Sequence, residues 1–274
     1  EVNVGQNIDI ASDGDVYNIL LIGSDTRDGW YGNSDSMILA SINSQTKTIY
    51  MTSFMRDLYA NIPNVGIRKL NSAYAVGGGP LLVSTIESNY RVDIDNYASV
   101  DFSSMANIID LVGGVDLEVS TQEAGYINMY LDEQCRLQGL NASDYYVAGG
   151  GITHLNGNQA VGFARIRYTS RGNEHSDYGR TSRQREILVQ LMQKARSLDA
   201  TTLLAVVNNM LPLITHNIDA ATLTTLIANA PYYINYDIQT DRIPYDGLYS
   251  NLGEELVPDF EATINRLHQT IYGN

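Results

Sequence analysis

Two aspartates lie near the ends of neighbouring apolar segments, where carboxylates can hold a metal ion. Asp25 comes two residues after an apolar run that ends at Gly23, and Asp35 follows ten residues later, just before the next apolar run. Two carboxylates at adjacent strand ends can share a hard cation such as Mg²⁺, which prefers oxygen ligands and keeps several waters. The alternative is turn capping, because aspartate favours the start of loops.

Arg56 is the first of several arginines whose positions suit a phosphate group. It comes at the end of the apolar run that begins at Thr48. We expect its side chain to point into the same crevice as the two aspartates, because ligands of open α/β sheets bind at strand ends. The alternative is a structural salt bridge to Asp57 or Asp35.

A second group of arginines gives one stretch of the chain a charge opposite to the rest. Residues 165–196 contain eight Arg and Lys against three Asp and Glu, a net charge of +5 in a chain of net charge −14. A planar guanidinium can hold phosphate through two parallel hydrogen bonds, which indicates a local anion site. A solvated helix face is the alternative. If residues 165–167 are extended, Arg165 and Arg167 project from the same face.

The continuation of this basic stretch has helical spacing. If residues 180–198 form a helix, Arg180, Arg183 and Gln184 share one face at spacings of three and four. These side chains would then lie in the first turn, where free backbone N–H groups favour an anion. Cations at a helix N-terminus are unfavourable unless an anion joins them, so this pattern predicts a phosphate site.

The elements that must position these side chains alternate between strands and helices. Apolar runs predict strands at residues 16–23, 36–42, 48–54, 97–100 and 232–239. Helical spacing predicts helices at residues 81–89, 103–111, 158–163 and 180–197, with two more between 200 and 230. Residues 43–47 are rich in turn formers and predict a hairpin, whereas the polar, Gly-rich residues 130–151 predict a loop. We therefore predict an α/β layered domain with a mixed sheet.

Length and composition fit one large folded domain. The chain has 274 residues, of which 44% are hydrophobic and 18% charged. Residues 1–13 are polar and aperiodic, and we interpret them as a linker stub before a single domain at 14–274. No apolar run reaches the ~18 residues of a membrane span, so any leader or anchor lies outside this sequence. The net charge argues against nucleic acid as a partner.

Eight short segments, in the same order along the chain, carry a more specific signal. They are Gly23–Arg27, Ser34–Met37, Arg56-Asp57, Lys69–Ala75 with Gly77-Gly78, Gly113–Asp116, Leu155–Ala160, Arg165–Arg167 and Gly179–Gln184. Together they resemble the LytR-CpsA-Psr family of bacterial cell-envelope proteins. The resemblance covers roughly residues 15 to 200.

The resemblance implies a fold, a place and a reaction. The fold is a three-layer α-β-α sandwich with a central mixed sheet, at the extracytoplasmic face of the membrane or in the cell wall. Proteins of the family are normally tethered by an N-terminal helix, which this sequence does not contain. The implied reaction is a phosphotransfer that moves a phosphoglycan, of the teichoic acid or capsular polysaccharide type, from a polyprenyl pyrophosphate carrier to peptidoglycan. The implied cofactor is Mg²⁺.

The residue pattern and the resemblance together lead us to expect a role for each of the residues quoted above. Asp25 and Asp35 are the ligands of Mg²⁺ on the pyrophosphate, and Asp25 is the leading candidate for the base that accepts the proton of the acceptor hydroxyl. The pyrophosphate oxygens are bound by Arg56, Arg165, Arg167 and Arg180, while Gln184 hydrogen-bonds a phosphate oxygen or orients Arg180. Asp25, Arg56, Arg165 and Arg167 are the predicted catalytic residues. Charge neutralisation and positioning are what phosphoryl transfer chiefly needs from a protein.

Two positions depart from the pattern of the family. Asn33 stands where the family usually has arginine, and Met55 where it usually has proline. Arg27, Arg68 or Arg171 are candidates for replacing the missing arginine. Two alternatives to the transferase hypothesis therefore stay open. One is a module that binds polyprenyl pyrophosphate or glycan with weak pyrophosphatase activity, and the other is a pyrophosphatase that uses water as acceptor.

Overall fold

The computed structural model describes residues 9–24, 32–171 and 176–273. The chain divides into two compact units. Unit 1 contains the residues up to Asp101 together with those from Thr215 onward, and unit 2 contains Phe102–Ile214. The single domain predicted for residues 14–274 stays a prediction. Within the described part of the chain, none of the helices has the length and hydrophobicity that a membrane span requires.

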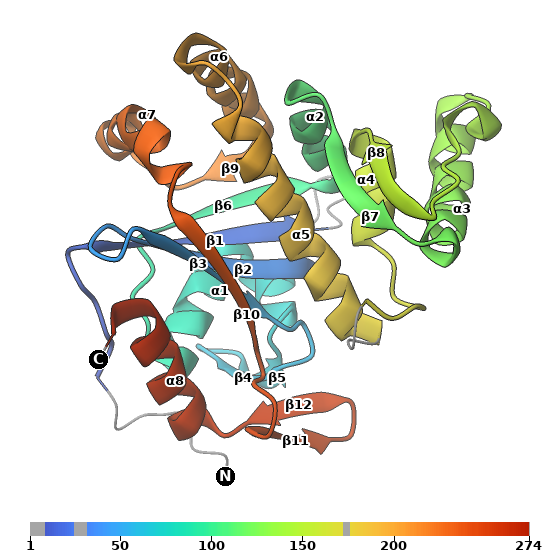
Figure 1. Ribbon diagram of the computed structural model, residues 1–274. Coiled ribbons are helices and arrows are strands. Elements are labelled where there is room, and N and C mark those ends of the chain that lie inside the picture. The colour runs from blue at the N-terminus through green and yellow to red at the C-terminus, as the bar shows by residue number, and fades with distance from the viewer. Residues whose placement is uncertain (1–8, 25–31, 172–175, 274) are drawn as a thin grey trace. The chain divides into compact units, whose positions relative to one another are not determined.

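Unit 1 is built on a six-stranded mixed sheet in the order β10-β3-β2-β1-β6-β9 (Figure 1). Its strands are β1 (Val16–Ser24), β2 (Ser34–Asn43), β3 (Thr48–Phe54), β6 (Asn96–Asp101), β9 (Thr215–His216) and β10 (Asp237–Ile243). β2 is antiparallel to both β1 and β3, and β6 is antiparallel to β9. β1 is parallel to β6, and β3 is parallel to β10. The predicted hairpin and the predicted mixed sheet are both confirmed.

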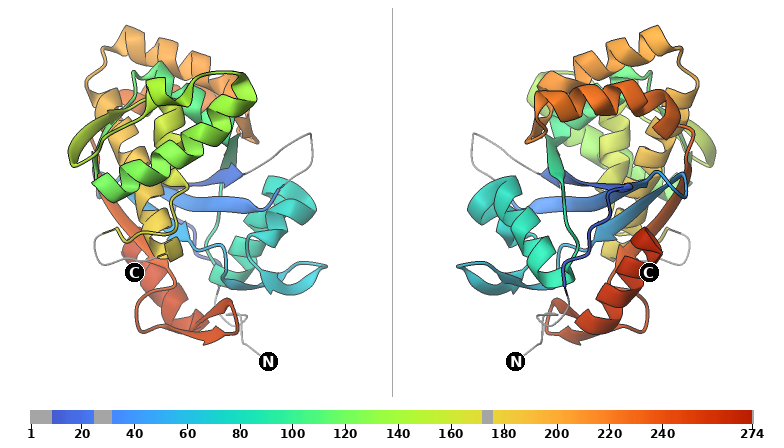
Figure 2. Two further views of the ribbon diagram at one scale, coloured as in Figure 1. Left: turned by 90° about the vertical axis from the view of Figure 1, so that its right-hand side faces the viewer. Right: turned by 90° about the vertical axis from the view of Figure 1, so that its left-hand side faces the viewer.

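Helices cover both faces of this sheet. The helices of unit 1 are α1 (Ser72–Tyr90), α7 (Ala220–Tyr233) and α8 (Phe260–Tyr272). α1 and α8 lie on one side of the sheet and α7 lies on the other (Figures 1 and 2). On the first side, the Tyr90 ring packs against Phe54 of β3 and Phe260 of α8, at centroid distances of 4.9 and 5.7 Å. The three layers of the predicted α/β fold are therefore present in unit 1.

Short strands extend unit 1 where the sequence carries little signal. β4 (Tyr59–Ile62) pairs with β5 (Gly66–Lys69), and β11 (Tyr249–Leu252) pairs with β12 (Glu255–Pro258). Neither pair was predicted, because four-residue strands offer too few positions for an alternating pattern. The strand predicted at 232–239 is wrong at its start, where Tyr232 and Tyr233 end α7.

The N-terminal segment is described from residue 9. The Ala11 amide donates to the Arg91 carbonyl at 2.8 Å, and the Ala11 carbonyl accepts from the Tyr272 hydroxyl at 3.0 Å. Residue 11 is therefore bound to the ends of α1 and α8. Most of the linker stub predicted at 1–13 lies outside the described residues.

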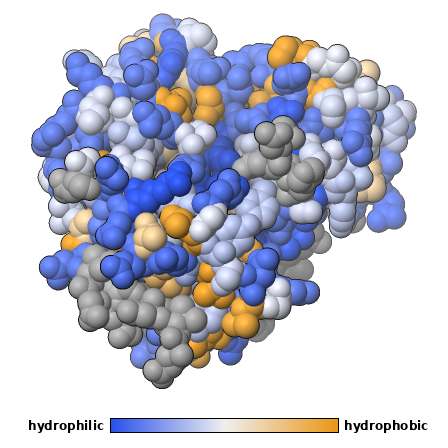
Figure 3. All heavy atoms as spheres, turned by 60° about the horizontal axis from the view of Figure 1, so that its bottom comes forward, coloured by the Kyte–Doolittle hydropathy of each residue, from blue (hydrophilic) through white to orange (hydrophobic). Residues whose placement is uncertain are grey.

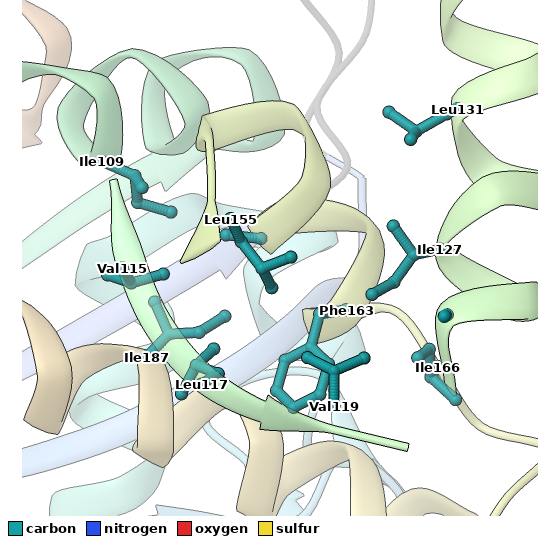
Figure 4. Packing of buried hydrophobic residues seen from close by; sticks show 12 residues of the cluster. Ile109, Val115, Leu117, Val119, Ile127, Leu131, Leu155, Phe163, Ile166 and Ile187 are labelled. Carbon is teal, nitrogen blue, oxygen red and sulfur yellow. The ribbon is translucent and has the colours of Figure 1, made fainter. Parts of the chain in front are cut away.

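Unit 2 is helical and contains one two-stranded sheet. Its elements are α2 (Phe102–Leu111), β7 (Val115–Val119), α3 (Thr121–Gln138), β8 (Gly151–Leu155), α4 (Gly157–Ala164), α5 (Ser176–Arg196) and α6 (Ala200–Met210), with short 3₁₀ turns at Ala142–Tyr145 and Leu211–Leu213. β7 and β8 pair antiparallel. Leu117 and Val119 of β7, Phe163 of α4 and Ile187 of α5 come together in its hydrophobic core (Figure 4).

On the molecular face drawn in Figure 3, hydrophilic side chains predominate and the hydrophobic ones form separate patches.

α3 corrects the sequence analysis, which predicted a loop for residues 130–151. The helix occupies the first part of that stretch and ends at Gly139, whose φ of 69° stops it. It begins with a reciprocal cap, in which Ser120 and Glu123 each accept a hydrogen bond from the backbone N–H of the other. Ile127 and Leu131 lie four residues apart and are buried in the core. The helix was missed because its exposed face is polar, which hid this narrow apolar stripe.

The close approach of α4 to α2 gives a direct stability test. A Cβ added to Gly157 would lie 2.0 Å from the Ala106 backbone carbonyl oxygen, so the backbone must move. We expect Gly157→Ala to lower the free energy of unfolding by about 1–3 kcal/mol, measured by urea unfolding. Gly125→Ala is the control, because Gly125 is exposed on α3 with open space around it, and it should be neutral or slightly stabilising. Equal stability of the two variants would contradict this packing.

Candidate functional site

Asp35 and Arg56 lie close together in unit 1. Asp35 is near the start of β2 and Arg56 follows the end of β3, and these ends are adjacent because the two strands are antiparallel. Arg56 Nη1 is 3.6 Å from Asp35 Oδ1, and Arg56 Nε is 3.4 Å from Asp57 Oδ2. Both salt bridges considered as structural alternatives are present. The guanidinium is partly exposed and still able to meet a ligand.

A pocket of about 530 Å³ opens beside Arg56. Its polar lining consists of Asn33, Arg56, Asp57, Arg68, Lys69, Asn71, Ser72 and Glu255. Lys69 Nζ is 3.0 Å from Asp57 Oδ1, and this hydrogen bond is the largest cause that raises the pKa of Lys69. Of the three arginines considered as replacements at Asn33, Arg68 lines the same pocket as Asn33. Arg27 lies outside the described residues.

The predicted Mg²⁺ ligands are only partly visible. Asp25 lies outside the described residues, so its distance from Asp35 is not part of the structure. Asp35 alone, with one oxygen facing the Arg56 guanidinium, is a poor donor set for a cation. In residues 9–24, 32–171 and 176–273, no group of three or more His, Cys, Asp or Glu side chains can hold a metal ion. The predicted site uses only two carboxylates, so Asp25 and Asp35 stay predicted ligands.

Arg165 is held in unit 2 by aromatic rings. Its guanidinium carbon lies 4.9 Å from the centroid of Phe102 and 4.7 Å from that of Tyr130, and the Tyr130 hydroxyl donates to the Arg165 carbonyl at 3.0 Å. Stacking uses the faces of the planar guanidinium and leaves its N–H edges for anion oxygens. The extended conformation considered for residues 165–167 is wrong at its first residue, because Arg165 caps α4 in the helical region.

Arg167 and Arg180 meet at one carboxylate. Arg167 Nε is 3.6 Å and Arg180 Nη2 is 3.4 Å from the same oxygen, Asp177 Oδ1. Burial raises the pKa of the nearby Tyr130, while Arg165, Arg167 and Arg180 all act to lower it. Arg165 thus stacks on the Tyr130 ring, while Arg167 and Arg180 act on the same phenol and share one carboxylate, which leaves an excess of positive charge.

The helix that carries Arg180 and Gln184 begins earlier than the sequence analysis predicted. α5 starts at Ser176, so Arg180 lies in its second turn and Gln184 one turn further on. The prediction that they occupy the first turn, and so act with the free N–H groups there, is wrong. Asp177 stands in the first turn instead, as the helix dipole favours. Arg180 is 2% exposed, and Gln184 Oε1 is buried as well.

Arg183 has a structural role that the sequence analysis did not foresee. It is 0% exposed, and its Nε donates to Glu123 Oε1 at 2.9 Å. Its remaining N–H groups donate to the carbonyls of Ile166, Thr169 and Ser170, at 3.3, 3.1 and 3.1 Å. Arg183 thus fixes the segment that follows Arg165, rather than contacting a ligand.

Glu123 joins the same buried ionic group and was also missed. Its Oε2 accepts from Arg171 Nη1 at 3.3 Å, and Arg171 is bound through two nitrogens to Glu186. Arg171 is therefore held by two carboxylates of unit 2, which does not support it as the replacement for the arginine missing at Asn33. The sequence signal for Glu123 is the Ser-x-x-Glu capping box, which also marks the start of α3.

Sequence comparison places the chain in a family. The profile of the LytR_cpsA_psr family matches residues 2–266. The chain belongs to the LytR-CpsA-Psr family. It is 35% identical over 272 residues to the polyisoprenyl-teichoic acid–peptidoglycan teichoic acid transferase TagU of Oceanobacillus iheyensis, covering 95% of this chain and 76% of that protein. For TagU of Bacillus subtilis the identity is 30%, over 69% of this chain and 55% of that protein. The chain thus spans about half to three quarters of the length of such relatives.

Comparison with solved structures confirms the fold. A protein from Streptococcus agalactiae superposes with a TM-score of 0.76 at 25% identity, over 94% of this chain and 88% of that one. TagT with bound octaprenyl pyrophosphate lipid superposes with a TM-score of 0.67 at 21% identity, over 100% of this chain and 94% of that one. The α/β fold with a central mixed sheet, predicted from the resemblance, is therefore correct.

Proposed function

We propose that this protein is a phosphotransferase that moves a phosphoglycan, most simply of the teichoic acid type, from a polyprenyl pyrophosphate carrier to peptidoglycan at the outer face of the membrane. The observation that carries the proposal is the meeting of Arg167 and Arg180 at Asp177, with Arg165 stacked on the nearby Tyr130, in a chain of net charge −14. Such a group suits a multiply charged phosphate ligand. The names of the TagU relatives agree with a transferase.

The reaction exchanges the phosphoanhydride bond of the pyrophosphate for a phosphoester bond to the acceptor. An acceptor hydroxyl oxygen attacks the phosphorus that carries the glycan, the bond from this phosphorus to the bridging oxygen breaks, and the polyprenyl phosphate leaves. The hydroxyl proton passes to a base, for which Asp25 is our candidate. Negative charge grows on the leaving phosphate, and fixed arginines can neutralise it with little reorganisation. Arg165 is well suited to this role because stacking on two rings already orients its guanidinium.

Arg56 of unit 1 and Gln184 of unit 2 are each proposed to contact a phosphate oxygen. Arg56 would exchange part of its interaction with Asp35 and Asp57 for phosphate oxygens. Gln184, on the same side of α5 as Arg180 and one turn away, would donate its amide to a phosphate oxygen or orient that arginine.

Mg²⁺ is proposed as cofactor on the strength of the resemblance, with Asp25 and Asp35 as its ligands. Asp35→Asn should reduce the release of polyprenyl phosphate and raise the Mg²⁺ concentration needed for half-maximal rate, because one charged ligand is lost. Asp246→Asn is the control, since it removes one charge from an exposed aspartate that pairs with Arg242. An unchanged Mg²⁺ requirement in Asp35→Asn would remove Asp35 from the proposed ligands.

Asn33 offers a gain-of-function test. Asparagine donates to an oxygen without charge and reaches less far than arginine. A charge-assisted hydrogen bond is worth about 1.5–3 kcal/mol, so Asn33→Arg should raise turnover by roughly 10- to 100-fold. Arg68→Ala should lower turnover in the native background if Arg68 already serves this pocket. No change in either variant would show that this pocket does not contact the pyrophosphate.

A further inference from the structure

Three tyrosines gather at the C-terminal end of α7, beside the turn between β2 and β3. They line a pocket of about 500 Å³ together with Ser44, Lys47, Asn229, Pro231 and Asn235. The turn lies at the opposite end of β2 from Asp35, nine residues away, which is about 30 Å at ~3.3 Å per residue. In unit 1, this tyrosine pocket (Tyr232, Tyr233 and Tyr236 with the lining named above) is therefore separate from Asp35 and Arg56.

Backbone and side-chain hydrogen bonds hold the tyrosine pocket in shape. The Tyr236 amide donates to the Tyr233 carbonyl at 3.0 Å, and the Asp237 amide donates to the Lys47 carbonyl at 3.0 Å. The Asn235 side-chain amide donates to the Pro231 carbonyl at 2.8 Å. The rings of Tyr233 and Tyr236 meet edge to face at 5.6 Å. The backbone on both sides of the pocket is fixed in this way, so it loses little conformational freedom when a ligand binds.

The chemistry of the lining selects among ligand classes. Tyr232 is 68% exposed, which offers a large rigid ring with a hydroxyl at its tip. The amides of Asn229 and Asn235 and the Ser44 hydroxyl add donors and acceptors around it. An acyl chain would bury these polar groups unpaired, and a nucleic acid would need more cations than Lys47. A sugar chain has apolar C–H faces for the rings and hydroxyls for the amides.

We propose that the tyrosine pocket is a carbohydrate-binding site that takes a stretch of neutral glycan. The ring of Tyr232 stacks on one sugar, while Asn229 and Asn235 hydrogen-bond its substituents. The choice of an N-acetylhexosamine chain as ligand depends on the proposed function, because such sugars form the peptidoglycan acceptor. The affinity of the pocket for sugar does not depend on the proposed function. A site of this kind would hold the acceptor chain well away from Asp35.

Titration with a tetramer of N-acetylglucosamine, followed by NMR chemical shifts, tests this inference. We expect saturable shifts at residues 229–236 in the native protein and a Kd at least about tenfold weaker in Tyr232→Ala, the size expected for loss of an aromatic anchor. Tyr232→Phe should keep most of the affinity, because the ring remains. Tyr145→Ala is the matched control, since Tyr145 is an exposed tyrosine of unit 2, and it should bind as the native protein does.

Several outcomes would overturn the inference. The first is the absence of saturable shifts in the native protein, and the second is an unchanged affinity in Tyr232→Ala. The third is a loss of affinity in Lys47→Ala but not in Tyr232→Ala, because that result would indicate an anion site. Arg165→Ala should bind the tetramer normally even if it transfers no glycan. Failure of the sugar site and failure of the proposed reaction therefore give different results.

Discussion

Arg165→Ala should reduce turnover of a polyprenyl pyrophosphate by about 10²-fold or more, because it removes a preoriented charge from the site of charge development. Folding should survive, because the stacking on Phe102 and Tyr130 is worth only about 1–2 kcal/mol. Release of polyprenyl phosphate measures the effect, and thermal unfolding checks the fold. We expect the same for Arg56→Ala in unit 1.

Lys194→Gln is the matched control for these arginines. It removes one positive charge from unit 2 at a lysine that pairs with Asp116 on the protein surface. Turnover should stay within about twofold of the native value, because exposed ion pairs contribute little. Near-normal turnover in both Arg165→Ala and Arg56→Ala would remove these two arginines from the proposed catalytic residues.

Arg183→Ala should lower the free energy of unfolding of unit 2 by about 3–5 kcal/mol, because it leaves the Glu123 carboxylate buried without its main partner. Glu123 is 1% exposed, and three carbonyls lose a donor at the same time. Burial is the main cause that lowers the pKa of Arg183, and the contact with Glu123 acts against it. Urea unfolding followed by circular dichroism gives the measurement.

Two further variants separate this ionic contact from a general loss of charge. Arg136→Ala removes an exposed arginine from the end of α3 and should change stability by less than about 0.5 kcal/mol. Glu123→Gln in the Arg183→Ala background should recover part of the loss, because a buried amide costs less than a buried charge. Equal stability of Arg183→Ala and the native protein would contradict the structural role given to Arg183.

The part of the fold that could be predicted is the part with local signals. β2 and β3 are apolar runs joined by turn residues, so their hairpin could be predicted from the sequence, and it brings Asp35 to Arg56. α3 was missed because its apolar stripe is narrow. The four-residue strands were missed because they are too short to show an alternating pattern of hydrophobic and polar residues.

The meeting of Arg167 with Arg180 at Asp177 could not be predicted from spacing. It depends on the path of the chain after Arg165, which is fixed by Arg183. That arginine in turn depends on Glu123, a partner sixty residues away in the sequence. A contact over such a distance leaves no periodic signal, so the same arginine pattern suited both a ligand site and a buried ion pair.

The most direct test of the proposed function is a transfer assay with purified peptidoglycan and a polyprenyl pyrophosphate-linked teichoic acid precursor. The protein, with Mg²⁺, should produce glycan attached to peptidoglycan through a phosphodiester, detected by mass spectrometry after muramidase digestion, together with an equal amount of polyprenyl phosphate. Arg165→Ala should produce about 10²-fold less of both products. Polyprenyl phosphate released without attached glycan would identify a pyrophosphatase. Neither product from a folded protein that still binds the precursor would contradict the proposal.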